Sequence, residues 1–90
     1  MKTKLFRVQD MDRHVVEWFP NLKQAKLRAL ECVGLGENQP LTDIVDIFDC
    51  EVEVNKAHLL QMLNHGSWFG SEKKTMEINQ EGIVDPKNWT

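Results

Sequence analysis

The side chains that most often bind metals in proteins are present here, but they do not stand at the spacing a metal site needs. His58 and His65 are seven residues apart, about two turns of a helix, which is too far for both to bind one ion directly. His-Glu-x-x-His, paired-cysteine and EF-hand patterns are absent. Asp43, Asp46 and Asp49 recur every three residues and match no calcium loop. The sequence therefore predicts no metal and no cofactor.

The side chains that could act as nucleophiles lack the local sequence contexts that activate a nucleophile, although any of the histidines could serve as a base. None of them lies in a nucleophile-elbow context, and no glycine-rich phosphate loop is present. His65-Gly66 is better explained as the end of a helix, with a histidine near the negative terminus and a glycine after it. We therefore expect no catalytic residues and no enzyme. The possible nucleophiles in the sequence are Cys32, Cys50, Ser67 and Ser71.

Cys32 and Cys50 stand singly, and both fall where we expect buried faces. Two free core thiols fit a reducing cytoplasm better than a secreted, disulfide-linked scaffold. The basic start of the chain has no apolar stretch behind it, and no apolar run is long enough to cross a membrane. A cytoplasmic protein with no membrane segment is expected.

Charge is distributed unevenly along the sequence. Residues 1–30 carry seven basic and three acidic side chains, a balance of +4, whereas residues 31–55 carry seven acidic and no basic ones. Asp49, Glu51 and Glu53 alternate with apolar residues, which would place them on one face of a strand. Such an acidic face could dock a larger protein with a basic surface or imitate a nucleic-acid backbone. The alternative is a solvated strand face whose charges discourage aggregation.

Trp68 and Phe69 lie between two glycines in a segment expected to be a loop. Two large aromatic side chains in a loop are typical of protein-binding hot spots. They could also stack on nucleobases, or fold back to fill the core of a chain this small. Trp89 is left open between packing on the sheet, covering a partner surface and lying free.

Arg7, Arg13 and Lys26 belong to the basic first third of the sequence. With Phe6 and Trp18 interleaved, they suggest a nucleic-acid-binding hairpin and helix. No ribonucleoprotein-type motif is present, and the net charge of −3 argues against nucleic-acid binding. We keep this as the second hypothesis.

Hydrophobic periodicity and turn residues indicate the elements that would position these groups. Two strands over 4–9 and 13–19, joined by a turn at 10–12, read as a hairpin. A helix from Asn21, with Gln24 three residues later, should end at Gly34, and a second helix should run from Asn55 to Gly66. Strand and helix are both possible over 41–48. A strand over 44–54 with an irregularity near Asp46 is favoured.

Residues 73–78 suggest a last short strand, and residues 79–90 an irregular tail. The order β-β-α-β-α-β predicts one α+β domain over residues 1–90. Its sheet of about four strands would be antiparallel or mixed, with two helices packed on one face. No known family is recognised from this pattern, so function is inferred from surface features alone.

The function expected from these features is a non-enzymatic protein–protein interaction module. A chain of this size without catalytic motifs suits an adaptor or an inhibitor of a larger protein, such as those that phages and other mobile elements encode. Its partner-binding residues would be Asp49, Glu51, Glu53, Trp68 and Phe69. Two alternatives remain: a nucleic-acid accessory protein, and a structural homodimer that pairs Trp68 and Phe69 or an open strand edge with its copy.

Overall fold

The computed structural model describes residues 2–10, 12, 15–36, 39–66 and 70–89 of the 90-residue chain. It confirms the α+β class, with two α-helices and five strands among these residues. In chain order the elements are β1 (Lys2–Asp10), β2 (Val16–Phe19), α1 (Leu22–Cys32), β3 (Ile44–Glu53), α2 (Lys56–His65), β4 (Gly70–Asn79), β5 (Gly82–Val84) and a 3-10 helix (Pro86–Asn88).

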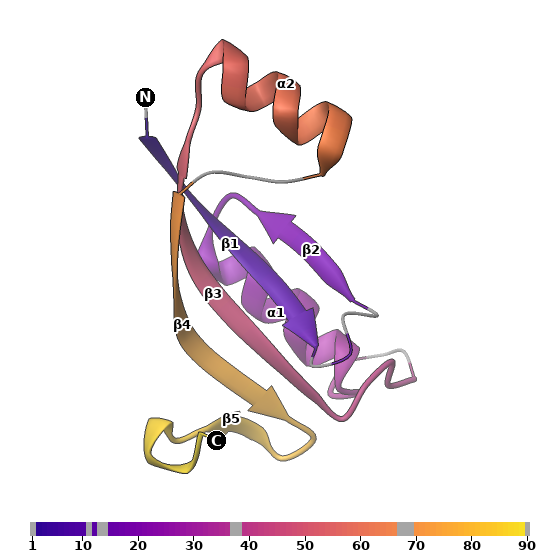
Figure 1. Ribbon diagram of the computed structural model, residues 1–90. Helices are drawn as coiled ribbons and strands as arrows, with labels where there is room; N and C mark the ends of the chain where they lie inside the picture. Colours follow the sequence, from indigo (N-terminus) through magenta and orange to yellow (C-terminus); the bar gives the residue numbers. More distant parts are fainter. Residues whose placement is uncertain (1, 11, 13–14, 37–38, 67–69, 90) are drawn as a thin grey trace.

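The strands form one antiparallel sheet in the order β2-β1-β3-β4-β5, so the mixed alternative is wrong. Figure 1 shows the long strands β1, β3 and β4 side by side, with α1 behind them. The expectation of about four strands missed β5, because residues 79–90 were expected to be irregular. Gly82, at φ 118°, adopts a backbone conformation that favours glycine, and it begins β5 after the short connection from β4.

The predicted N-terminal hairpin is confirmed as β1 and β2. Asp10 is buried and closes its end: the Asp10 N–H donates to the Val15 carbonyl at 3.2 Å, and the Val15 N–H donates to Asp10 Oδ1 at 3.0 Å. The predicted turn at 10–12 and the start of the second strand include Met11, Arg13 and His14, which lie outside the described residues.

The first helix was predicted correctly at both ends. Asn21 Oδ1 accepts the N–H of Gln24 at 2.9 Å, and Gly34 follows the helix with φ 88°. The side that faces the sheet is made of small residues, which lets the helix approach closely. Its buried residues Ala25, Ala29 and Cys32 pack with Val33 and with a set of sheet residues. Those sheet residues are Val8, Val45, Ile47 and Ile78.

The alternation of apolar and polar residues changes near Asp46 because burial moves from one face of β3 to the other. It does not come from a bulge in β3. Its pairing with β1 runs without interruption from Glu53 to Val45. Ile47 faces α1, whereas Cys50 is buried on the opposite face, so burial moves from one face to the other along the strand. The irregularity lies in β4, where Thr75 is the extra residue and its hydroxyl donates to the Ile47 carbonyl at 3.2 Å.

The second helix has the predicted ends but not the predicted packing. Asn55 Oδ1 accepts the N–H of His58 at 2.8 Å, and the N–H of Gly66 donates to the Met62 carbonyl at 3.0 Å. No α2 side chain is buried, and Figure 1 shows α2 set beyond one end of the sheet. The expectation that both helices pack on one face is therefore wrong, because the leucines of α2 do not join the core.

The two capping asparagines give a matched test of this difference. We expect Asn21→Ala to lower the free energy of global unfolding by about 1 kcal/mol, because α1 is packed into the core. Asn55→Ala makes the same chemical change on a helix with no buried residue, so it should destabilise α2 locally and leave the global value unchanged. Urea unfolding followed by tryptophan fluorescence, with amide exchange over α2, measures both. Equal global losses would contradict the independence of α2.

Candidate functional site

Asp49, Glu51 and Glu53 lie on one face of β3, as predicted. The same face carries Val45 and Ile47, which α1 covers, so the acidic side chains follow where α1 no longer covers the sheet. The side chains of Asp49 and Glu51 are 28% and 43% exposed. Asp46, on the same strand, points to the opposite face.

Lysines flank this acidic row on both neighbouring strands. Lys2 Nζ lies 3.5 Å from Glu51 Oε1, and Lys4 Nζ lies 3.7 Å from Asp49 Oδ2. On the other side, Lys73 is the register partner of Asp49. The surface is therefore a row of alternating charges rather than a uniformly negative ridge. We call it the charged row; it consists of Lys2, Lys4, Asp49, Glu51, Glu53 and Lys73.

A shallow polar hollow of about 160 Å³ lies at the end of the charged row. Lys2, Glu51 and Glu53 line it together with Gly70 and Ser71 at the start of β4. Because β3 ends at Glu53 and α2 begins at Lys56, this end of the row adjoins α2 in the chain.

Three leucines of α2 are exposed at helical spacing. Leu59, Leu60 and Leu63 are 46%, 51% and 75% exposed, respectively. Positions 59 and 63 are one turn apart, as are 60 and 63, so the three side chains form one apolar face. We call it the α2 leucine face. Trp68 and Phe69, the predicted aromatic anchors, follow α2 in the sequence but lie outside the described residues.

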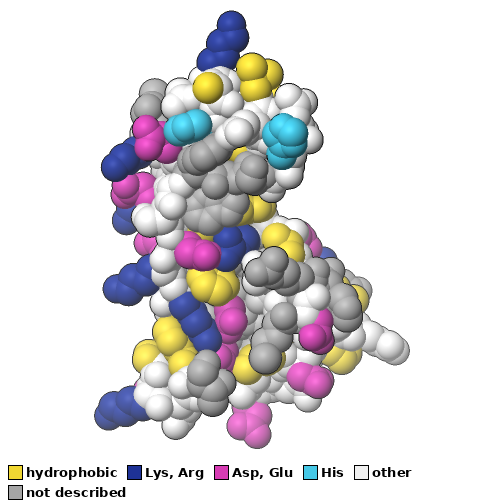
Figure 2. Space-filling view, viewed as in Figure 1, with side chains coloured by type: hydrophobic (Ala, Val, Ile, Leu, Met, Phe, Trp, Pro, Cys, Tyr) yellow, Lys and Arg dark blue, Asp and Glu magenta, His cyan; other side chains and the backbone are white. Residues whose placement is uncertain are grey.

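The sheet face opposite α1 carries a row of aromatic and basic side chains that the sequence analysis missed as a set. The guanidinium of Arg7 lies 5.4 Å from the Trp18 ring centroid and 4.6 Å from that of Phe48. Both aromatic residues are register partners of Arg7, from β2 and β3. Arg7 also forms an ion pair with Glu72 of β4. Figure 2 views this face and shows yellow, blue and magenta side chains interspersed.

Lys74 extends the same face toward the C-terminus. Its Nζ lies 3.2 Å from Asp46 Oδ1, 2.8 Å from Glu77 Oε1 and 4.8 Å from the Trp89 ring centroid. Trp89 Nε1 donates to the Val84 carbonyl at 3.3 Å, which places this tryptophan against the sheet edge. Burial raises the pKa of Asp46, and Lys74 opposes that rise. For Lys74, burial lowers the pKa, but the bonds to Glu77 and Asp46 outweigh it and the pKa is raised.

The residues of the nucleic-acid hypothesis are not brought together. Arg7 is only 7% exposed and lies on the sheet face opposite α1, whereas Lys26 belongs to α1 itself. Arg13 lies outside the described residues. Arg7 and Lys26 therefore do not share one basic surface.

Cys32 and Cys50 are both free and buried, as predicted. Cys32 packs between α1 and the sheet, while Cys50 lies on the opposite sheet face, so the sheet separates the two thiols. Burial raises the pKa of both thiols above the usual 9.0, which disfavours the reactive thiolate. Among the described residues, no three histidine, cysteine or carboxylate side chains gather closely enough to hold a metal ion.

No protein-family model matches the sequence, and no curated protein or solved structure is significantly similar to the chain. Within the described part of the chain, neither helix has the length and apolar character needed to span a bilayer. Functional inference therefore depends on the surfaces described above.

Proposed function

We propose that this protein is a non-enzymatic protein–protein interaction module that binds its partner through the α2 leucine face and the adjoining charged row. The observation that carries the proposal is the exposure of Leu59, Leu60 and Leu63 on a helix with no buried side chain. Burying an exposed leucine contributes about 1.5–3 kcal/mol, so three clustered leucines supply a strong apolar anchor.

The short length of α2 supports the same proposal. Isolated helices shorter than about 12–15 residues are marginal in water, and in proteins most helical stability comes from packing an amphipathic face. The ten residues of α2 have both caps but no buried face of their own. A partner that covers the leucines would supply the missing packing.

The charged row would set the orientation of the partner. Exposed ion pairs contribute less than about 1 kcal/mol each, so those of Lys2 and Lys4 are easily exchanged for pairs with another protein. Three lysines alternate with Asp49, Glu51 and Glu53, which favours a partner with alternating charges over the uniformly basic surface expected above. Trp68 and Phe69 stay in the proposal as additional anchors because they stand shortly after α2 in the sequence.

A pair of charge-introducing substitutions on α2 tests the proposal. Leu60→Asp combined with Leu63→Asp should reduce partner capture from a native, nuclease-treated lysate by at least about a hundredfold in affinity, because two apolar anchors are lost. The fold should be preserved, since both side chains are exposed. Leu35→Asp combined with Leu41→Asp is the matched control, because those leucines are 47% and 59% exposed in the loop after α1.

Three results would contradict the proposal. The first is capture of the same protein in equal amount by the α2 variant. The second is capture that nuclease abolishes, which would favour the nucleic-acid alternative. The third is a solution mass equal to that of two chains, which falls to the mass of one chain in the α2 variant. That result would show that the α2 leucine face is a homodimer interface.

A further inference from the structure

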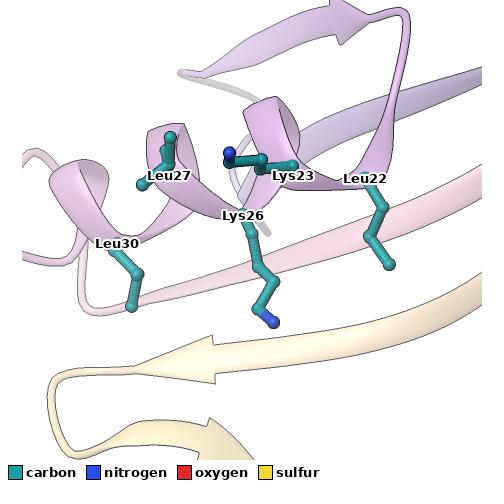
Figure 3. Close-up of a pocket in the computed structure, with 5 residues that line it drawn as sticks. All are labelled: Leu22, Lys23, Lys26, Leu27 and Leu30. Carbon is teal, nitrogen blue, oxygen red and sulfur yellow. The ribbon is translucent and has the colours of Figure 1, made fainter.

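A second apolar surface runs along α1, away from α2. It is a groove of about 400 Å³. Leu22, Lys26 and Leu30 form one row at spacings of four residues, and Lys23 and Leu27 form the adjacent row. Figure 3 shows the two rows extending from neighbouring sides of the helix. From Leu22 to Leu30 the groove spans about 12 Å of helix.

The bottom and the rim of this groove differ in burial. Leu30 is partly buried and packs against the hydrophobic core, so the groove is anchored on rigid structure. Leu22 and Leu27, at the rim, are 36% and 55% exposed. Exposed leucines at these positions are not needed by the core, which α1 contacts through its alanines and Cys32.

The charge of the groove is the feature that selects an occupant. Lys23 and Lys26 line it, and none of the described residues that line it is acidic. Within the described residues, neither lysine forms an ion pair, whereas Arg28 on the same helix pairs with Glu17 at 2.9 Å and with Glu31 at 3.5 Å. The groove therefore offers three leucines and two cations that form no ion pair with another described side chain.

We propose that this groove binds an acidic amphipathic helix of a partner protein. Two rows at four-residue spacing form ridges with a channel between them, and such ridges accept the ridges of another helix. The bound helix would place apolar side chains at i, i+3 or i+4, and i+7 against the leucines. Its flanking Asp or Glu side chains would meet Lys23 and Lys26.

This surface is independent of the α2 leucine face. With both occupied, the protein would join two binding partners, which gives the adaptor role a structural basis. The inference does not rest on the proposed function, because it concerns different residues and a ligand of different charge.

Selection from a library of displayed peptides of random sequence, about 14 residues long, tests the inference with the full chain as bait. Enriched peptides should carry apolar residues at helical spacing with acidic flanks. Binding measured by fluorescence anisotropy should fall by at least about tenfold for Leu27→Asp. It should fall similarly for Lys23→Glu combined with Lys26→Glu. Exchanging the acidic residues of the peptide for lysines should restore binding to that lysine variant.

Two control variants separate this surface from others. Leu41→Asp and Lys87→Glu make the same changes at exposed positions outside the groove and should leave peptide binding unchanged. The Leu60→Asp, Leu63→Asp protein should also bind normally, so failure of one surface is distinguishable from failure of the other. Circular dichroism confirms that each variant is folded.

The inference would be overturned by enrichment of basic or non-amphipathic peptides, by no enrichment at all, or by equal binding to Leu27→Asp. Binding of anionic phosphatidylserine vesicles or of a DNA duplex that is lost in the lysine variant, without peptide enrichment, would assign the groove to a lipid or nucleic-acid surface instead.

Discussion

Ile47→Ala is expected to lower the free energy of unfolding by about 2–5 kcal/mol, the range for removing a large aliphatic side chain from a core. Ile47 is fully buried on β3 and faces α1. Its register partners, Val8 on β1 and Met76 on β4, also belong to or pack against the core. With neighbours on both adjacent strands and a helix above, the site has little freedom to collapse around the cavity.

The matched control is Ile83→Ala, which makes the same change on the edge strand β5. Ile83 is 58% exposed, so its truncation should change the free energy of unfolding by less than about 0.5 kcal/mol. Urea unfolding of both variants measures the difference. Similar losses at the two positions would show that the core is not centred on β3.

Lys74→Met should be the second most destabilising change, with a loss of about 3 kcal/mol at neutral pH. Lys74 is the cation that both Asp46 and Glu77 contact, and Glu77 is only 6% exposed. Removing the Lys74 ammonium leaves the carboxylates of Asp46 and Glu77 close together in a desolvated site. We expect the lower end of the range for a broken buried pair, because the side chains of Lys74 and Asp46 are 23% and 22% exposed.

The loss in Lys74→Met should also depend on pH. Burial already raises the pKa of Asp46 above 3.8, and without Lys74 nothing in this cluster opposes that rise. The folded variant then holds the proton more tightly than the unfolded chain, so lowering the pH from above the raised pKa toward 3.8 stabilises it. The difference from the unmodified protein should shrink over that window.

Lys73→Met supplies the control on the neighbouring residue of β4. Lys73 is exposed and belongs to the charged row, so the same substitution should change the free energy of unfolding by less than about 0.5 kcal/mol. Denaturation of both variants at several pH values measures the two effects. A loss in Lys74→Met that is independent of pH would contradict the role of the carboxylates.

The charged row shows how strand pairing changes the meaning of a sequence pattern. The alternation of Asp49, Glu51 and Glu53 correctly predicted that they share a face. It could not predict Lys2 and Lys4, which lie 45 or more residues earlier in the chain and reach the row through the β1–β3 pairing. This pairing sets two lysines of the basic first third beside two carboxylates of the acidic segment that follows it.

The α2 leucine face shows a second limit of periodicity. The spacing of Leu59, Leu60 and Leu63 is typical of a helix with an apolar side. An apolar side must be covered in most folds, so packing on the sheet was the natural expectation. Whether the apolar side of α2 can pack on the sheet depends on how much of the sheet α1 already covers. That depends on the whole fold and not on the local sequence.

The sequence by itself determined the local elements of this protein: both helices with their asparagine caps and terminal glycines, the hairpin, and the strand alternation over residues 49–53. These depend on hydrogen bonds and side-chain periodicity within a few residues. Only the tertiary structure decided which strands are neighbours, which face each helix covers and where burial changes sides along β3. Those choices join residues such as Arg7 and Glu72, which are 65 positions apart, and they depend on the packing of the whole sheet.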